Sequence, residues 1–325
     1  MRRFTMTRAG DVDDALLATH GAPSQYCAGG TTLIDLMRQD VERPERVVAI
    51  NRLPLTTIQS TADNGLVIGA LATNSDVAHH PKVRSDYRLL SEAILSGATT
   101  QIRNMATTGG NLLQRTRCIY FRDPHSACNK RDPGSGCPAI SGFNRNLAVL
   151  GTSEHCIASN PSDQNVALMA LGATIEVQSA AQTRRSIPID RFFLLPGDTP
   201  ERETTLEPGE LIVAVTLPPM NGWRSHYLKL RDRQSYEFAL ASAAVAVRLE
   251  GSTIADARIA LGGVGTIPWH AAQAQSALTG KTATREAFRA AAELALRDAR
   301  PQSENGFKIE LAKRCLVQAL IEVTA

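Results

Sequence analysis

The first fifty residues alternate between short apolar runs with the period of a strand and stretches with the period of a helix. Strands are predicted over residues 4–8, 24–27 and 47–50, and helices over residues 11–19 and 33–39. An alternating order of strands and helices is typical of a βαβ unit, whose strands run parallel. We therefore expect a small parallel sheet at the start of the chain.

From residue 57 onward the texture of the sequence changes. Apolar runs at 58–60 and 65–70 flank Asp63-Asn64-Gly65, and an Asn-Gly step between such runs favours a hairpin. We expect a larger sheet of mixed or antiparallel strands, accompanied by helices. Its other strands are predicted over 148–151, 173–177 and 210–217, and its helices over 74–79, 87–96 and 163–170.

The segment Pro-Pro-Met-Asn-Gly at residues 218–222 ends the strand before it, because a proline pair and a glycine interrupt regular structure. We place a domain boundary there, between residues 1–217 and 218–325. The fold class expected is α+β: two subdomains, one small and parallel and one larger, followed by a C-terminal antiparallel sheet with helices. In this last part, strands are predicted over 223–230, 239–249 and 254–262, and helices over 285–299 and 306–323.

Composition narrows the class of protein. The 325 residues are 43% hydrophobic and 21% charged, which is ordinary for a globular protein and enough for two or three cores. A net charge of +3 is too small to indicate binding to nucleic acid or to a membrane surface. No apolar run is long enough to span a membrane, and the two arginines near the N-terminus precede no apolar segment, so we expect no secretory signal.

Between Arg117 and Asn146 neither period persists, while Gly, Pro, Asp and Asn recur. So long an irregular stretch is uncommon in a compact domain unless something other than a hydrophobic core holds it. We expect a metal centre in this insertion, which spans about residues 115–157. Four of the six cysteines of the chain lie in it, namely Cys118, Cys128, Cys137 and Cys156.

Cysteine spacing alone leaves three possibilities open: a [4Fe-4S] cluster, a structural zinc, and plain thiols or disulfides. The gaps of nine, eight and eighteen residues contain no C-x₂-C pair, which zinc sites usually have, and so favour a larger cluster. A chain of this length does not need disulfides to fold. Nearby cations would offset the negative charge of a cluster, or would simply form a solvated surface. These cations are Arg115, Arg117, Arg122, Lys130, Arg131 and Arg145.

Two glycine pairs, Gly29-Gly30 and Gly109-Gly110, stand beside hydroxyl groups. The first pair lies between a predicted strand and a predicted helix, an arrangement that aims free backbone N–H groups at a phosphate. Glycine also lets an anion approach the backbone closely, because no Cβ stands in the way. Neither pair belongs to a G-x-G-x-x-G motif, and each alone is equally compatible with an ordinary turn.

Three motifs, in their order along the chain, resemble those of the FAD-binding medium subunits of the molybdenum hydroxylases, which include the flavoproteins of xanthine dehydrogenase and carbon monoxide dehydrogenase. The resemblance covers nearly the whole chain, but ordinary members lack the four-cysteine loop. That insertion is similar to the one in the FAD-binding subunit of the bacterial periplasmic aldehyde oxidoreductase, which carries a [4Fe-4S] cluster, and more loosely to that of hydroxybenzoyl-CoA reductase. The motifs are Ala28-Gly29-Gly30-Thr31-Thr32, Thr107-Thr108-Gly109-Gly110-Asn111 and Pro161-Ser162-Asp163.

The resemblance implies an FAD site within residues 1–217 and four cluster ligands. The cysteines named above match the ligands of the cluster. The flavin contacts that it implies are Ala28, Gly29, Gly30, Thr31 and Thr32 at the pyrophosphate, Thr107, Gly110 and Asn111 on the other side of the phosphates, Ser162 and Asp163 at the ribityl–ribose region, and Leu206 and Lys229 against the flavin ring.

The function implied is electron transfer, because the sequence offers no Ser-His-Asp set, no motif for a metal-activated water and no convincing pair of catalytic carboxylates. The resemblance implies a heterotrimer that oxidises aldehydes to carboxylic acids, with molybdopterin in a large subunit and two [2Fe-2S] clusters in a small subunit. The alternative is a freestanding FAD flavoprotein with a structural zinc in the cysteine loop. For location, we expect export to the periplasm together with a signal-bearing partner, with the cytoplasm as the alternative.

Overall fold

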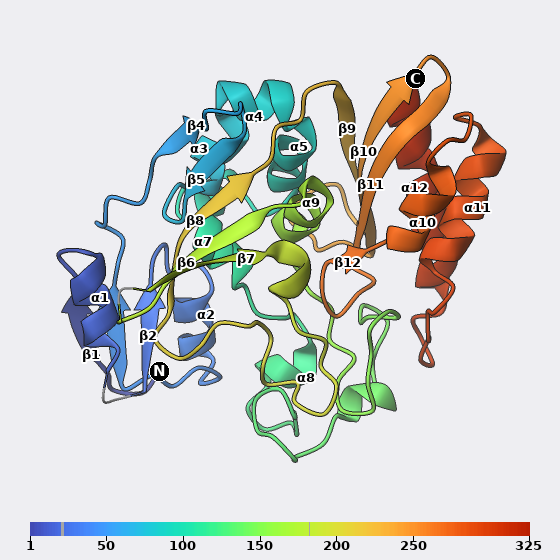
Figure 1. The fold of residues 1–325 in the computed structure, drawn as a ribbon. Helices are drawn as coiled ribbons and strands as arrows, with labels where there is room; N and C mark the ends of the chain where they lie inside the picture. The colour runs from blue at the N-terminus through green and yellow to red at the C-terminus, as the bar shows by residue number, and fades with distance from the viewer. Residues whose placement is uncertain (21–22, 182) are drawn as a thin grey trace.

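The computed structural model describes residues 1–20, 23–181 and 183–325. Three sheets follow one another across the molecule, and the cysteine loop lies below the central sheet in the view of Figure 1. The predicted α+β class is confirmed, with one parallel and two antiparallel sheets.

The N-terminal sheet has three parallel strands in the order β1-β3-β2. Leu16 of the first helix and Val48 of the central strand are buried together in a small core. The predicted βαβ unit is therefore confirmed. Its elements are β1 (Thr5–Arg8), α1 (Val12–Ala18), β2 (Ser24–Cys27), α2 (Leu33–Arg38) and β3 (Arg46–Ala49).

The central sheet has five antiparallel strands in the order β4-β5-β8-β6-β7. Side-chain caps begin two of its helices: Thr73 accepts a hydrogen bond from Asp76 N, and Ser162 accepts one from Asn165 N. The strands are β4 (Ile58–Ser60), β5 (Leu66–Gly69), β6 (Thr174–Gln178), β7 (Arg184–Pro188) and β8 (Leu211–Leu217). The helices are α3 (Asn74–His79), α4 (Pro81–Asp86), α5 (Arg88–Ser96) and α9 (Asp163–Leu171).

The predicted strand at residues 148–151 is wrong. Ala148, Val149 and Leu150 are fully buried, but Leu150 forms only an isolated bridge, to Gly265. The amide of Ala148 donates to Ile157 O and the amide of Val149 to Val264 O. These hydrogen bonds go to single loop residues, so the segment is not part of a sheet. Its apolar sequence reflects burial alone.

The C-terminal sheet has four antiparallel strands in the order β12-β11-β10-β9. Helices pack on both of its faces, so that alternate residues of β10 enter different cores: Ala244 joins the core of the central sheet and Val245 that of the C-terminal helices. The elements are β9 (Trp223–Leu230), β10 (Ala241–Glu250), β11 (Thr253–Gly262), β12 (Trp269–His270), α10 (Ala272–Leu278), α11 (Arg285–Ala295) and α12 (Phe307–Thr324).

One hydrophobic core crosses the predicted boundary at residue 218. It contains Leu217 from β8 together with Tyr227 from β9. Tyr87, which is also fully buried, donates from its hydroxyl to Pro218 O over 3.0 Å. The hydrophobic core is therefore continuous across the predicted boundary. The division into domains at residues 1–217 and 218–325 stays a prediction.

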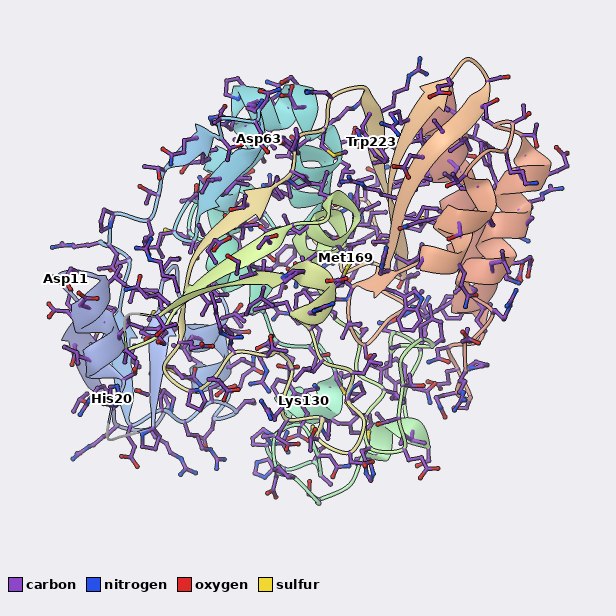
Figure 2. All side chains as sticks on the ribbon, in the orientation of Figure 1. Asp11, His20, Asp63, Lys130, Met169 and Trp223 are labelled. Carbon is purple, nitrogen blue, oxygen red and sulfur yellow. The ribbon has the colours of Figure 1, made fainter. Side chains whose placement is uncertain are left out.

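The cysteine loop contains only short helical turns, and the C-terminal region holds its far end. Asn144 exchanges hydrogen bonds with Glu304, and the Nζ of the fully buried Lys308 donates to Leu147 O over 2.9 Å. Figure 2 labels Lys130 on this loop. The remaining short elements are α6 (Thr100–Arg103), α7 (Thr108–Leu112), α8 (Ile119–Arg122), η1 (Pro138–Ile140) and η2 (Ile189–Arg191). Within the described ranges, no helix has the length and hydropathy needed to cross a membrane.

Candidate cofactor site

The first glycine turn joins β2 to α2 and has a backbone that only glycine adopts easily. Gly30 has φ +72°, in the left-handed region. A Cβ on Gly29 would overlap the carbonyl oxygen of Met105, so the turn rests directly on the segment that leads into the second glycine motif. In the described part of the chain, the backbone N–H groups of residues 28–32 donate no hydrogen bonds. These amides are therefore available to an anion.

The second glycine motif begins α7 and is anchored to the end of β5. Thr107 caps the helix, with Oγ1 accepting from Gly110 N over 3.2 Å. The amides of Thr108 and Gly109 donate to Ala72 O and Ala70 O. These amides are already hydrogen-bonded within the protein. A phosphate could therefore approach this motif closely and bind its hydroxyl groups, but it would find few free N–H donors there.

The two motifs face one cavity of about 440 Å³, a volume typical of a cofactor pocket. The second motif lines it with Thr107, Gly109 and Gly110, whereas the predicted contact Asn111 is not among the cavity residues. Leu206, predicted to lie against the flavin ring, does line the cavity and packs against the central core. The predicted contacts found here are Ala28, Gly29, Gly30, Thr31, Thr32, Thr107, Gly110 and Leu206.

The other four predicted contacts lie beside this cavity in a connected polar group. Ser162 Oγ donates to Asn111 Oδ1 over 2.7 Å, and Lys229 Nζ donates to Asp163 Oδ2 over 2.8 Å. Ser162 and Asp163 line a smaller cavity of about 200 Å³, which shares residues 159–161 with the larger one. Lys229 lines neither cavity and reaches them only through its contact with Asp163. Its place against the flavin ring stays a prediction.

The four loop cysteines come together in one hydrophobic cluster with Phe121 as a central member. Cys118, Cys128 and Cys156 are buried, Cys137 is half-buried, and all four are free thiols. The disulfide alternative is therefore wrong for this structure. Among the described residues, no three His, Cys, Asp or Glu side chains are close enough to bind one metal ion. Four thiols that share one buried site could serve as the ligands of a metal centre.

Backbone amides point at the sulfur atoms, as is common around iron–sulfur clusters. Ala158 N lies 3.5 Å from Cys156 Sγ, and amides of Tyr120 and Phe121 reach Cys118. Burial raises the pKa of the Cys118 thiol to about 11 and also raises the pKa values of Cys137 and Cys156. Metal binding at these thiols would therefore displace protons.

Most cations of the loop are paired with carboxylates, so part of their positive charge is already neutralised. Their expected role in offsetting the charge of a cluster stays a prediction. Lys130 is the one that also lowers the pKa of Cys156 by its charge, although burial outweighs it. The partners are Glu42 and Glu203 for Arg115, Asp35 for Arg117 and Arg122, Glu203 for Lys130, main-chain carbonyls for Arg131, and Asp232 for Arg145.

Two features of the site could not be found from the sequence. Cys156 lines the larger cavity, so the cysteine cluster and the glycine motifs share a wall. Tyr227 donates from its hydroxyl to Asp163 Oδ1 over 2.6 Å, across 64 residues of sequence. Neither residue type nor spacing indicates such a contact, because it depends on how β9 packs against α9.

Comparison with known proteins agrees with this site. The family described as the FAD binding domain in molybdopterin dehydrogenase matches residues 2–220, and the CO dehydrogenase flavoprotein C-terminal domain matches residues 226–323. The chain is 47% identical to the aldehyde oxidoreductase FAD-binding subunit PaoB of Escherichia coli (strain K12), over 100% of this chain and 99% of that protein.

More distant relatives have the same architecture. The carbon monoxide dehydrogenase medium chain of Hydrogenophaga pseudoflava is 28% identical, over 94% of this chain and 91% of its own length. A solved structure of carbon monoxide dehydrogenase from that organism, lacking the Mo-pyranopterin moiety, matches with a TM-score of 0.77 at 26% identity, over 99% of this chain and 97% of the other. The chain therefore belongs to the family of FAD-binding medium subunits of the molybdenum hydroxylases.

Proposed function

We propose that this chain is the electron-transfer subunit, carrying FAD and a [4Fe-4S] cluster, of a molybdenum-containing aldehyde oxidoreductase. The observation that carries the proposal is the shared wall of the two sites. Cys156 lines the same cavity as Gly30 and Gly110, so two electron carriers bound at these sites would be neighbours. A flavin accepts two electrons and releases them together or one at a time, which suits it to stand between one-electron and two-electron partners.

The larger cavity has a polar turn and apolar walls, which suit the pyrophosphate and the ring system of FAD. The free amides of residues 28–32 offer donors to the pyrophosphate, and Gly29 and Gly30 leave no side chain in their way. Leu206 offers an apolar surface to the ring system. Asp163 would face the cofactor from the smaller cavity.

For the cysteine loop, we favour a [4Fe-4S] cluster held by Cys118, Cys128, Cys137 and Cys156. In a zinc site with Zn–S bonds of about 2.3 Å the four sulfurs would lie roughly 4 Å apart. The described residues contain no group of three ligands gathered for one ion, although the four thiols share one buried cluster. The alternative, a freestanding flavoprotein with a structural zinc, is disfavoured by the lack of a C-x₂-C pair in the sequence and by the similarity to subunits of larger complexes.

The substrate class and the partners follow from the relatives. The E. coli relative at 47% identity is named as an aldehyde oxidoreductase subunit. In our proposal a large subunit with molybdopterin oxidises the aldehyde to a carboxylic acid, and a small subunit with two [2Fe-2S] clusters connects it to this chain. Electrons then leave through FAD to an acceptor.

The experiment that tests this division of labour compares the chain with the complex. The purified flavin-loaded chain should keep its flavin absorbance when mixed anaerobically with aldehydes, whereas dithionite should bleach it. Adding the two partner subunits should make aldehyde bleach it as well. Bleaching of the chain alone by aldehyde would favour a freestanding flavoenzyme instead.

The compartment is part of the same proposal. We propose that the chain reaches the periplasm only together with a signal-bearing partner. Cell fractionation with and without the partner genes tests this. Periplasmic recovery of the chain expressed alone, or cytoplasmic recovery of the whole complex, would contradict it.

A further inference from the structure

Two side chains of strand β9 converge on one carboxylate at the start of α9. Tyr227 and Lys229 are two residues apart and so lie on the same face of the strand. The Tyr227 hydroxyl donates to Asp163 Oδ1 over 2.6 Å, and Lys229 Nζ donates to Oδ2 over 2.8 Å. Each oxygen of Asp163 therefore has its own donor.

Two helix ends stand beside the Asp163–Lys229 ion pair. Asp163 is the first residue of α9, where the helix dipole stabilises a negative charge. Lys229 Nζ also lies 3.3 Å from Ser96 O, at the end of α5, where the dipole favours a cation. The side chains are only 3% exposed for Lys229 and 10% for Asp163, so solvent screens this pair little.

Gly97 makes room for this arrangement. A Cβ at this position would come to 3.1 Å from Asp163 Oδ2, the oxygen that binds Lys229. The carboxylate therefore fits closely between the end of α5, strand β9 and its own helix. A group packed in this way keeps one orientation, provided that its hydrogen bonds persist.

We propose that Tyr227 is a positioning residue for the flavin: its hydroxyl fixes the orientation and the effective charge of Asp163, which faces the flavin site from the smaller cavity. This inference rests on the proposed function, because it takes the flavin to lie beside Ser162 and Asp163. A hydrogen bond from the phenol draws negative charge away from the carboxylate. Loss of that bond leaves more negative charge near the cofactor and makes the flavin harder to reduce.

The phenol is suited to this role because it stays a donor. Tyr227 is buried, and burial together with the charge of Asp163 raises its pKa well above the ordinary value. Its hydroxyl proton therefore remains in place throughout the working pH range.

The test compares Tyr227→Phe with Tyr87→Phe in the full chain loaded with FAD. Tyr87 is a matched control, because it too is buried and donates its hydroxyl to one acceptor, the carbonyl oxygen of Pro218. Neither Tyr87 nor its acceptor lines a cavity described above. Both variants should lose some thermal stability and retain FAD. Only Tyr227→Phe should shift the midpoint potential of the bound flavin, to a more negative value.

An unchanged flavin potential in folded, FAD-loaded Tyr227→Phe would overturn the inference while leaving the proposed function intact. An equal shift in Tyr87→Phe would also overturn it. Absence of FAD from the wild-type chain would overturn the proposed function as well. If Tyr227→Phe does not fold, Asp163→Asn removes the charge that the phenol is proposed to control. A shift of the flavin potential to a more positive value there supports the inference, and an unchanged potential contradicts it.

Discussion

Gly110→Ala separates what the protein needs at this position from what the cofactor needs. Gly110 is exposed, lies within α7 and lines the larger cavity. A Cβ placed there would lie 3.0 Å from Thr107 Oγ1 and would meet no other atom within 4 Å outside its own helix backbone and chain neighbours. The protein itself therefore accommodates a methyl group once the Thr107 hydroxyl moves by a few tenths of an ångström, whereas a bound ligand would exclude it.

Gly110→Ala should change the stability of the flavin-free protein little and its FAD affinity strongly. Alanine is favoured over glycine inside a helix by about 1 kcal/mol, which offsets a small displacement of the Thr107 hydroxyl. We expect the free energy of unfolding of the flavin-free protein to change by less than about 1 kcal/mol. Loss of one hydrogen bond to a charged phosphate costs about 1.5–3 kcal/mol. At about 1.4 kcal/mol per factor of ten, FAD affinity should fall roughly ten- to a hundredfold or more.

Urea denaturation of the flavin-free protein and titration of FAD by quenching of its fluorescence measure the two quantities. Gly251→Ala is the control. Gly251 has φ +62° and no neighbour within 4 Å of an added Cβ, in the turn between β10 and β11. It should lose about 1–2 kcal/mol of folding stability and keep full FAD affinity. If Gly110→Ala binds FAD as tightly as the wild type, the phosphate site is wrongly placed.

Four further variants test the cluster and the stability of the fold. Cys118→Ser should lose bound iron by metal analysis, and iron retained in this variant would contradict the ligand assignment. Cys315 lies on α12 in the C-terminal core, so Cys315→Ser should keep iron and lose about 1–3 kcal/mol of stability, since it buries a hydroxyl. His226 lies 2.9 Å from a carboxylate oxygen of Glu92, and this contact raises its pKa. The raised pKa belongs to the folded state, so the wild type should be more stable than His226→Gln below about pH 6.5. This advantage should disappear as the pH rises through the folded pKa of His226. Urea midpoints that differ by the same amount at every pH would contradict this. Lys308→Met removes one donor from each of three carbonyl oxygens and should cost about 1–3 kcal/mol in urea denaturation. An unchanged midpoint would show that this lysine does not hold the loop.

Regular elements were predictable where local pattern and packing agree. The strand predicted at 210–217 is β8, Leu211–Leu217, and the helix predicted at 163–170 is α9, Asp163–Leu171. The strand predicted at residues 148–151 was wrong, because a fully buried loop is as apolar as a strand. Short helices such as α6 and α7 contain too few residues to show a period.

The site was predictable as a set of motifs but not as a geometry. The glycine turn and the four cysteines are local signals, and the fold brings each group together. The contact between Tyr227 and Asp163 and the place of Cys156 in the cavity wall depend on tertiary packing. The carboxylate partners of the loop cations, such as Asp35, could not be predicted because they lie far away in the sequence.

The central claim is that one chain holds both a flavin and an iron–sulfur cluster. The most direct test is the content of iron, acid-labile sulfide, zinc and FAD in protein purified without oxygen. We predict about four iron and about four sulfide per chain, as a [4Fe-4S] cluster requires, together with about one FAD. Stoichiometric zinc without iron, or a chain that carries iron but cannot be loaded with FAD, would contradict the account.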